Sequence, residues 1–177
     1  RRTLGISQRR VRAIVKDDLL EMLALVEQQK PMKAARDRAL LLIGFAGAFR
    51  RAELVAIRYE DMTVVDEGIE ILLPRSKTGQ EGIGRTAFIP RAKGARCPDA
   101  AIDQWKAVSH TDSGYVFRRV TRQDTVGSRP LTGQSVALIL KAAYQRGGGN
   151  AALAGGGLRR CGGWAAAADA GPADHGS

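Results

Sequence analysis

The 177-residue sequence has few residues that bind metals or form disulfides, with only two cysteines and two histidines. Cys97 and Cys161 lie far apart without CxxC spacing, so neither a zinc site nor a disulfide framework is predicted. The apolar run from Ala39 to Phe49 has eleven residues, whereas a membrane helix needs about 20. No signal peptide opens the sequence. These absences favour a cytoplasmic, reducing setting and no membrane partner.

Acidic residues are also scarce relative to basic ones. The 28 Lys and Arg against 18 Asp and Glu give a formal net charge of +10, which predicts a polyanionic partner and favours nucleic acid over a membrane surface. Residues 1–16 carry six basic side chains and no acidic one. This segment is interpreted as a basic linker or arm that lies along a phosphate backbone, with a solvated tail as the alternative.

The composition divides the chain into three segments. Its length suits one domain with a hydrophobic core, or one domain plus an arm. The core is predicted at 17–146, after the basic linker or arm at 1–16. The last 31 residues contain ten glycines, and residues 151–177 contain nine alanines. Such a composition forms a core poorly, so 147–177 is predicted to be a Gly/Ala-rich, degenerate segment.

Helical and extended patterns follow one another within this core. Helices are predicted from Asp17 to Pro31, from Lys33 into the apolar run, at 98–109 with Trp105 facing the core, and at 132–146 with Thr132 as a cap. The buried residues expected on the last helix are Val136, Leu138, Ile139 and Leu140. Strands at 68–74 and 85–90 are predicted to form a hairpin. The expected fold is α+β, mainly helical, with a small antiparallel sheet and a concave basic face.

The stretch from Arg38 to Met62 contains a first candidate site. Its apolar run predicts a helix buried on all sides, with Arg50 directly after it. A guanidinium at that position is costly to desolvate and stays charged, so an anionic partner is expected nearby. Glu53 lies three residues on and shares a helical face if the helix continues. Two alternatives stay open: an Arg–Glu pair that joins two helices, or an arginine held rigidly for phosphate binding.

The connection between the two predicted strands contains a second candidate. Residues 75–84, RSKTGQEGIG, are rich in turn-forming residues and include Lys77. A lysine on a hairpin can reach into a site that other elements build, although an exposed lysine without such a role is the alternative. The segment is not a phosphate-binding P-loop, because no GxxxxGK pattern is present.

Taken together, these segments resemble the catalytic domain of the tyrosine recombinases, the phage-integrase family. GAFRRAELVAIRYEDM at 47–62 is similar to the family's first arginine box, and the spacing to Glu53 places the family arginine at Arg50. RSKTGQEGIGRTAFIP resembles the hairpin that carries the catalytic lysine, which matches Lys77. GGGLRR at 155–160 can be aligned with the His-x-x-Arg box, so that Arg159 matches the second arginine. The resemblance covers 17–146 well and 147–170 poorly.

The resemblance implies a mainly helical DNA breaking-rejoining domain with a small antiparallel sheet. It implies site-specific DNA recombination or integration, as in mobile elements, with double-stranded DNA and other recombinase protomers as partners and no small-molecule substrate. The family uses no metal or cofactor: a tyrosine hydroxyl attacks the scissile phosphate and forms a phosphotyrosine. Two arginines, here Arg50 and Arg159, stabilise charge on the phosphate oxygens. Lys77 would be the general acid that protonates the leaving 5′ oxygen.

The sequence departs from the family pattern in two places. Gly156 stands where the box histidine is expected, and the three tyrosines all precede Arg159, so none occupies the place of the nucleophile. We therefore expect DNA binding without strand cleavage by this chain alone. Three hypotheses follow: a fragment or degenerate copy of an integrase, a non-catalytic DNA-binding module or regulator of a full-length recombinase, and a basic helical interaction protein in which Arg50 merely pairs with Glu53.

Overall fold

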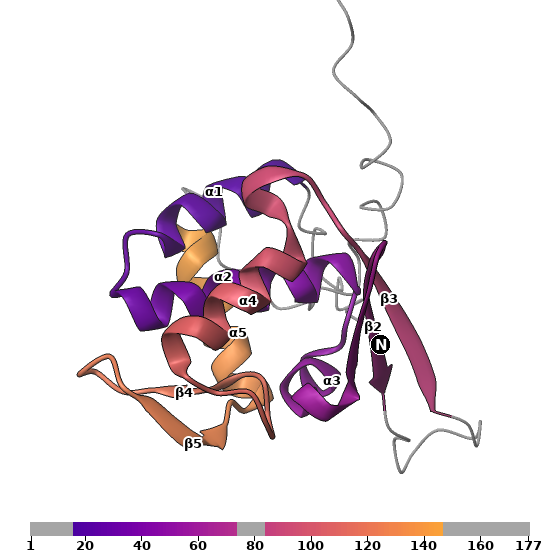
Figure 1. The fold of residues 1–177 in the computed structure, drawn as a ribbon. Coiled ribbons are helices and arrows are strands. Elements are labelled where there is room, and N and C mark those ends of the chain that lie inside the picture. Colours follow the sequence, from indigo (N-terminus) through magenta and orange to yellow (C-terminus); the bar gives the residue numbers. More distant parts are fainter. Residues whose placement is uncertain (1–15, 74–83, 147–177) are drawn as a thin grey trace, which may run out of the picture.

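A computed structural model describes residues 16–73 and 84–146 (Figure 1). The helices in these ranges are α1 (Lys16–Val26), α2 (Pro31–Ala46), α3 (Arg51–Ala56), α4 (Pro98–Ser109) and α5 (Gly133–Arg146), with 3-10 turns at Tyr59–Asp61 and Gly94–Arg96. The strands are β1 (Met62–Val65), β2 (Gly68–Leu73), β3 (Arg85–Pro90), β4 (Arg118–Val120) and β5 (Val126–Pro130). The predicted fold class, mainly helical with small antiparallel sheets, is confirmed.

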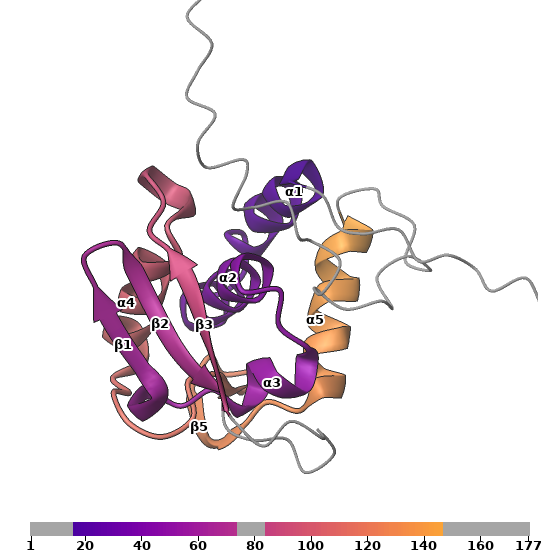
Figure 2. The same ribbon diagram turned by 90° about the vertical axis from the view of Figure 1, so that its right-hand side faces the viewer.

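Helix α2 forms the centre of the core. Helices α1 and α4 pack against it, α5 packs against α1, and β3 contacts α2 from the sheet (Figures 1 and 2). Residues 39–45 are buried around the whole circumference of the helix, as the uninterrupted apolar run predicts. Trp105 on α4 is fully buried, and its indole N–H donates to the carbonyl of Val116 at 2.8 Å. Within the described ranges, we find no helix with the length and apolar character needed to cross a bilayer.

The larger sheet is a three-stranded antiparallel meander in the order β1-β2-β3. Ile69 pairs with Ile89 and Ile71 with Ala87, and these four side chains face the core. This alternation is the pattern that predicted β2 and β3 from the sequence. Strand β1 extends the predicted hairpin by one strand. A second antiparallel pair, β4–β5, was not predicted because its short strands lack an apolar alternation.

The predicted continuous helix through Phe49 is wrong, because α2 ends at Ala46. The N–H of Ala48 donates to the carbonyl of Phe45 at 3.4 Å, and the N–H of Phe49 to that of Gly44 at 3.3 Å. These two bonds form a Schellman motif, in which Ala48 adopts the left-handed conformation with φ 48°. Phe49 turns back into the core with 0% exposure. Chain direction therefore changes before Arg50, and α3 is a separate helix.

Two smaller predictions also needed correction. Leu138 is 58% exposed rather than buried, because it lies two residues from both Val136 and Leu140 and so points to the opposite face of α5. Helix α2 begins at Pro31 and not at Lys33, since proline suits the first turn of a helix. The predicted cap of α5 is confirmed: the N–H of Ser135 donates to Thr132 Oγ1 at 3.1 Å.

Candidate nucleic-acid interface

Arg50 lies at the N-terminal end of α3, directly after the buried Phe49. Its backbone is extended, with φ −67° and ψ 150°, as is usual for a residue that precedes a helix. Its side chain is 54% exposed, so the desolvation cost expected from the sequence is not incurred. The buried Phe49 fixes the backbone next to Arg50 while the guanidinium faces solvent.

Glu53 connects Arg50 to the sheet. Its Oε2 accepts the backbone N–H of Arg50 at 2.7 Å, and its Oε1 accepts the Arg50 guanidinium at 3.3 Å. The guanidinium of Arg85, the first residue of β3, donates to the same Oε2 at 3.2 Å. Arginine has no side-chain acceptor, so only the glutamate half of a capping box forms. Glu53 thus holds the first turn of α3 and links it to the start of β3.

These three side chains form a surface group that we call the Arg50–Glu53–Arg85 cluster. Two guanidinium groups share one carboxylate, so the cluster carries a net positive charge. Each arginine side chain is more than half exposed, whereas that of Glu53 is 20% exposed. A guanidinium has five N–H donors in a planar fork. Both arginines therefore retain donors beyond their bond to Glu53, and such donors suit the oxygens of a phosphate.

The structure does not describe the other two predicted site residues. Lys77 and Arg159 lie outside the described residues. Leu73 ends β2 and pairs with Arg85 at the start of β3, so these two residues mark the end of the sheet where Arg85 bonds to Glu53. Arg85 was not singled out from the sequence, because an arginine at the start of a strand carries no distinguishing pattern.

Helix α3 also lies beside the start of α5. A Cβ at Gly133 would stand 3.7 Å from the Cβ of Arg51, which shows how closely the two helices approach. Figures 1 and 2 both show α3 next to the lower end of α5 and near β5. The cluster and the first residues of α5 therefore belong to the same end of the molecule.

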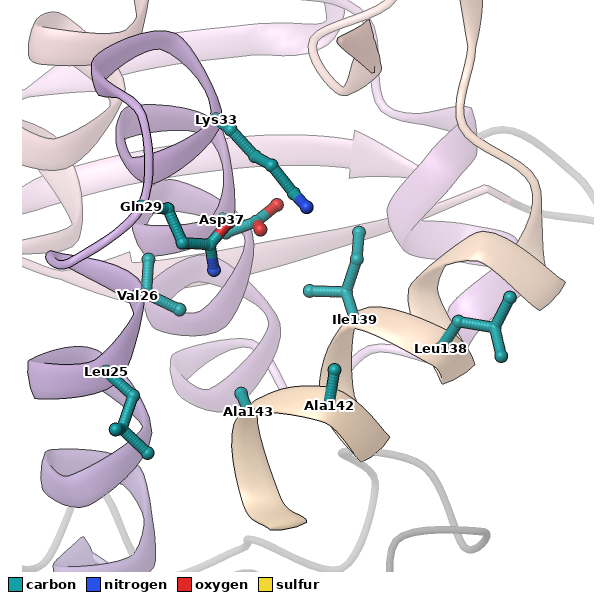
Figure 3. Close-up of a pocket in the computed structure, with 9 residues that line it drawn as sticks. All are labelled: Leu25, Val26, Gln29, Lys33, Asp37, Leu138, Ile139, Ala142 and Ala143. Carbon is teal, nitrogen blue, oxygen red and sulfur yellow. The ribbon is translucent and has the colours of Figure 1, made fainter. Parts of the chain in front are cut away.

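A pocket of about 240 Å³ lies elsewhere, between α1, α2 and α5 (Figure 3). Lys33 and Asp37 point into it from α2, while Ile139 lies across from them on α5. The carboxylate of Asp37 is buried and accepts two bonds from Arg36, at 2.6 and 2.8 Å. Burial raises the pKa of Asp37 despite the attraction of Arg36. The pocket is smaller than most ligand sites, which measure about 300–1,000 Å³, and the Asp37 carboxylate that lines it is already bonded to Arg36.

The three tyrosines of the sequence all fall in the described ranges. Tyr59 and Tyr144 are buried, with 9% and 6% exposure. The Tyr59 hydroxyl lies 3.4 Å from Thr111 Oγ1, and burial raises its pKa above the ordinary value. Tyr115 is half-buried, with the Arg58 guanidinium 5.2 Å from its ring centre. Across residues 16–73 and 84–146, no cluster of three or more His, Cys, Asp or Glu is arranged to hold a metal ion.

Comparison with known proteins identifies a relative by sequence. No family model matches the chain. The chain is 39% identical over 142 residues to a protein from Selenomonas ruminantium described as an integrase/recombinase XerD homolog. The match covers 80% of this chain but 41% of that protein, so the chain spans about two fifths of its relative.

Solved structures of similar fold are also recombinases. The XerH site-specific recombinase bound to its difH substrate superposes with a TM-score of 0.56 at 14% identity, over 80% of this chain and 40% of that one. Its post-cleavage complex gives 0.58 at 15% identity, covering 85% and 40%. The XerA recombinase gives 0.54 at 13% identity, covering 84% and 46%. Sequence similarity and fold agree: the chain is similar in sequence to part of an integrase/recombinase XerD homolog and in fold to part of the XerH and XerA recombinases.

Proposed function

We propose that this chain is the DNA-binding core of a site-specific tyrosine recombinase and that Arg50 contacts a phosphate of double-stranded DNA. The observation that supports this most is the Arg50–Glu53–Arg85 cluster, in which two exposed guanidinium groups meet at one carboxylate. Phosphate contacts from arginine supply most of the affinity of such proteins for DNA. The charge of +10 and the DNA-bound relatives of similar fold support the same partner.

Within this proposal the residues have different roles. Arg50, together with Arg159 and with Arg85 as a neighbour, would stabilise negative charge on the non-bridging oxygens of the scissile phosphate. Lys77 would protonate the 5′ oxygen that leaves when a tyrosine hydroxyl attacks the phosphorus.

The alternative role for Arg50, a pair with Glu53 that joins two helices, has a direct contact in its favour. Its energetic weight is small, however. Ion pairs between exposed side chains contribute about 0–1 kcal/mol, because water screens the charges and ordering the side chains costs entropy. More than half of the Arg50 side chain is exposed. A purely structural role would therefore gain little from an arginine at this position.

Substitution of Arg50 by alanine separates the two roles. If Arg50 binds phosphate, Arg50→Ala weakens binding to a duplex and makes the dependence of log affinity on log salt shallower by about one unit. The unfolding free energy should change by less than about 1 kcal/mol. Both quantities can be measured on the same protein, by fluorescence anisotropy with labelled DNA and by urea denaturation.

Arg96 provides a matched control. It is exposed and lies on the 3-10 turn before α4, at the end of the molecule opposite α3 (Figures 1 and 2). Arg96→Ala removes the same charge as Arg50→Ala. Because Arg96 lies far from the proposed phosphate contact, this substitution should leave the salt slope unchanged. An Arg50→Ala protein that unfolds more easily but keeps the wild-type salt slope would favour the structural role.

A non-catalytic DNA-binding module, or a regulator of a full-length recombinase, is the second candidate function. The burial of Tyr59 and Tyr144 favours it, because neither hydroxyl is presented to a ligand in the described structure. DNA binding is common to both candidates, and covalent capture of DNA distinguishes them.

A further inference from the structure

The β4–β5 hairpin concentrates arginine on one short element. Residues 118–130 contain four arginines and one acidic residue, Asp124. Arg118 turns inward and donates to the carbonyls of Tyr115, at 2.9 Å, and Ser113. The remaining arginines are exposed: Arg119, Arg122 and Arg129.

The single acidic residue of this hairpin is engaged elsewhere. Both carboxylate oxygens of Asp124 accept backbone N–H groups at the start of α2, from Met32 at 2.9 Å and Lys33 at 3.0 Å. The Lys30 ammonium in turn donates to the carbonyl of Arg122 at 2.9 Å. Asp124 thus faces the positive end of the α2 dipole, and no carboxylate of the hairpin pairs with its three exposed arginines.

The turn that carries Arg122 is internally ordered. Thr121 and Thr125 bond to each other through their backbones, at 2.9 Å, and through their hydroxyls, at 2.8 Å. The N–H of Asp124 donates to the carbonyl of Thr121 at 3.1 Å. An ordered turn loses less conformational entropy when it binds, so arginines held on it suit a recognition surface.

The hairpin and the Arg50–Glu53–Arg85 cluster lie at opposite ends of α2 along its axis. Asp124 caps the first turn of α2, whereas Arg50 follows its last turn. Sixteen helical residues span about 24 Å, which corresponds to roughly seven base pairs of a duplex at about 3.4 Å each. Both ribbon views show β5 and α3 at the lower end of the molecule (Figures 1 and 2).

We infer that the β4–β5 hairpin is a second DNA-binding surface, on which Arg119, Arg122 and Arg129 contact phosphates of the duplex that flanks the Arg50 contact. This inference rests on the proposed function. Duplex DNA fits because three exposed cations on one hairpin with an ordered turn, unpaired with any acid of that hairpin, match a regular array of phosphates. The contacts fix the position of the protein on the duplex and carry no base specificity.

The test compares two double variants of equal charge. Arg122→Gln/Arg129→Gln changes the hairpin, and Lys93→Gln/Arg96→Gln changes exposed residues at the opposite end of the molecule. Binding of each protein to a random-sequence duplex of about 30 base pairs is measured over a range of salt concentrations. The hairpin variant should bind more weakly, with a salt slope shallower by about two units. The control should match the wild type, and urea unfolding confirms that both variants fold.

The outcomes separate this inference from the proposed function. A hairpin variant with the wild-type affinity and salt slope overturns the second surface, whatever Arg50→Ala shows. If the hairpin variant is weakened while Arg50→Ala behaves as wild type, the hairpin binds DNA and the Arg50 contact is refuted. When both contacts exist, their effects on binding free energy should add, because the sites are far apart. Equal weakening in the hairpin variant and the control would reveal a general charge effect and refute a defined surface.

Discussion

The backbone conformation of Ala48 determines the position of Arg50. It is an L-residue in the left-handed region, with φ 48°, and the Schellman motif that ends α2 depends on this conformation. For residues other than glycine, that conformation costs about 1–2 kcal/mol. The burial of Phe49 in the core compensates for the strain. Exposure of Arg50 is therefore a consequence of how α2 ends.

Replacement of Ala48 by glycine should stabilise the protein. Glycine adopts this φ without steric strain, although it adds about 0.4–1 kcal/mol of conformational entropy to the unfolded chain. Relief of strain outweighs that loss, so Ala48→Gly should raise the unfolding free energy by about 0.5–1 kcal/mol. Urea denaturation measures this change. A lower unfolding free energy would show that the left-handed turn is not strained.

Gly47 provides the contrasting substitution one residue earlier. A Cβ at Gly47 would stand 2.2 Å from the Phe49 ring and 2.8 Å from Ile89 Cδ1, which is closer than real contacts allow. We expect Gly47→Ala to lower the unfolding free energy by about 1–3 kcal/mol, as overpacking does. Both expected changes have the opposite sign to the general entropic effect of glycine, which destabilises, so together they would identify local steric fit as the cause.

At the scale of the elements, α2 depends on a partner that is distant in the sequence. Its N-cap residue, Lys30, makes no side-chain capping bond. Asp124 supplies that function from the β4–β5 turn, 92 residues away from Met32, while its own backbone is left-handed with φ 64°. The hairpin and the central helix are thereby joined in one structural unit.

Removal of this cap should destabilise the whole domain. Asp124→Ala deletes both acceptors and leaves alanine in a left-handed conformation, so the unfolding free energy should fall by about 1–2 kcal/mol. Asp124→Asn is the control, because asparagine tolerates the conformation and retains one acceptor oxygen. The unfolding free energy should fall less in Asp124→Asn than in Asp124→Ala. Equal stability of Asp124→Ala and the wild type would mean that the cap contributes nothing.

The elements also show how far the sequence alone could predict the fold. Strands β2 and β3 were recognised from their alternation, and helix α4 from the proline at its start. Both signals are local in the sequence. The break between α2 and α3 was missed, since an apolar run with an internal glycine reads as one helix. The capping of α2 by Asp124 and the bond between Glu53 and Arg85 were missed as well. Such contacts connect residues that only the folded chain brings together.

The candidate site was predictable to a similar extent. The position of Arg50 and its contact with Glu53 follow from their spacing, and the structure places both at the start of α3. The catalytic roles of Arg50, Lys77 and Arg159 come from a resemblance and stay predictions. That Arg85 shares the carboxylate of Glu53 could not be predicted, because a contact between separate elements has no local signal in the sequence.

At the scale of the whole molecule, DNA binding and DNA cleavage place different demands on the chain. Binding requires exposed positive charge, which the cluster and the hairpin provide. Cleavage requires a tyrosine hydroxyl that reaches a phosphorus atom. Tyr59 and Tyr144 are buried in the core, and Tyr115 lies beneath the Arg58 guanidinium. The raised pKa of Tyr59 also makes its hydroxyl harder to ionise.

We therefore expect the 177-residue chain to bind duplex DNA without forming a covalent phosphotyrosine. The measurement uses a nicked, end-labelled duplex that traps the covalent intermediate of a recombinase, followed by denaturing electrophoresis. Wild type and Arg50→Ala should both yield free DNA alone, although the wild type shifts the same duplex under native conditions. A denaturant-resistant adduct of the wild type that disappears in Arg50→Ala would contradict this expectation. Such an adduct would require one of the three tyrosines to leave its packed position, and peptide mapping would identify which one.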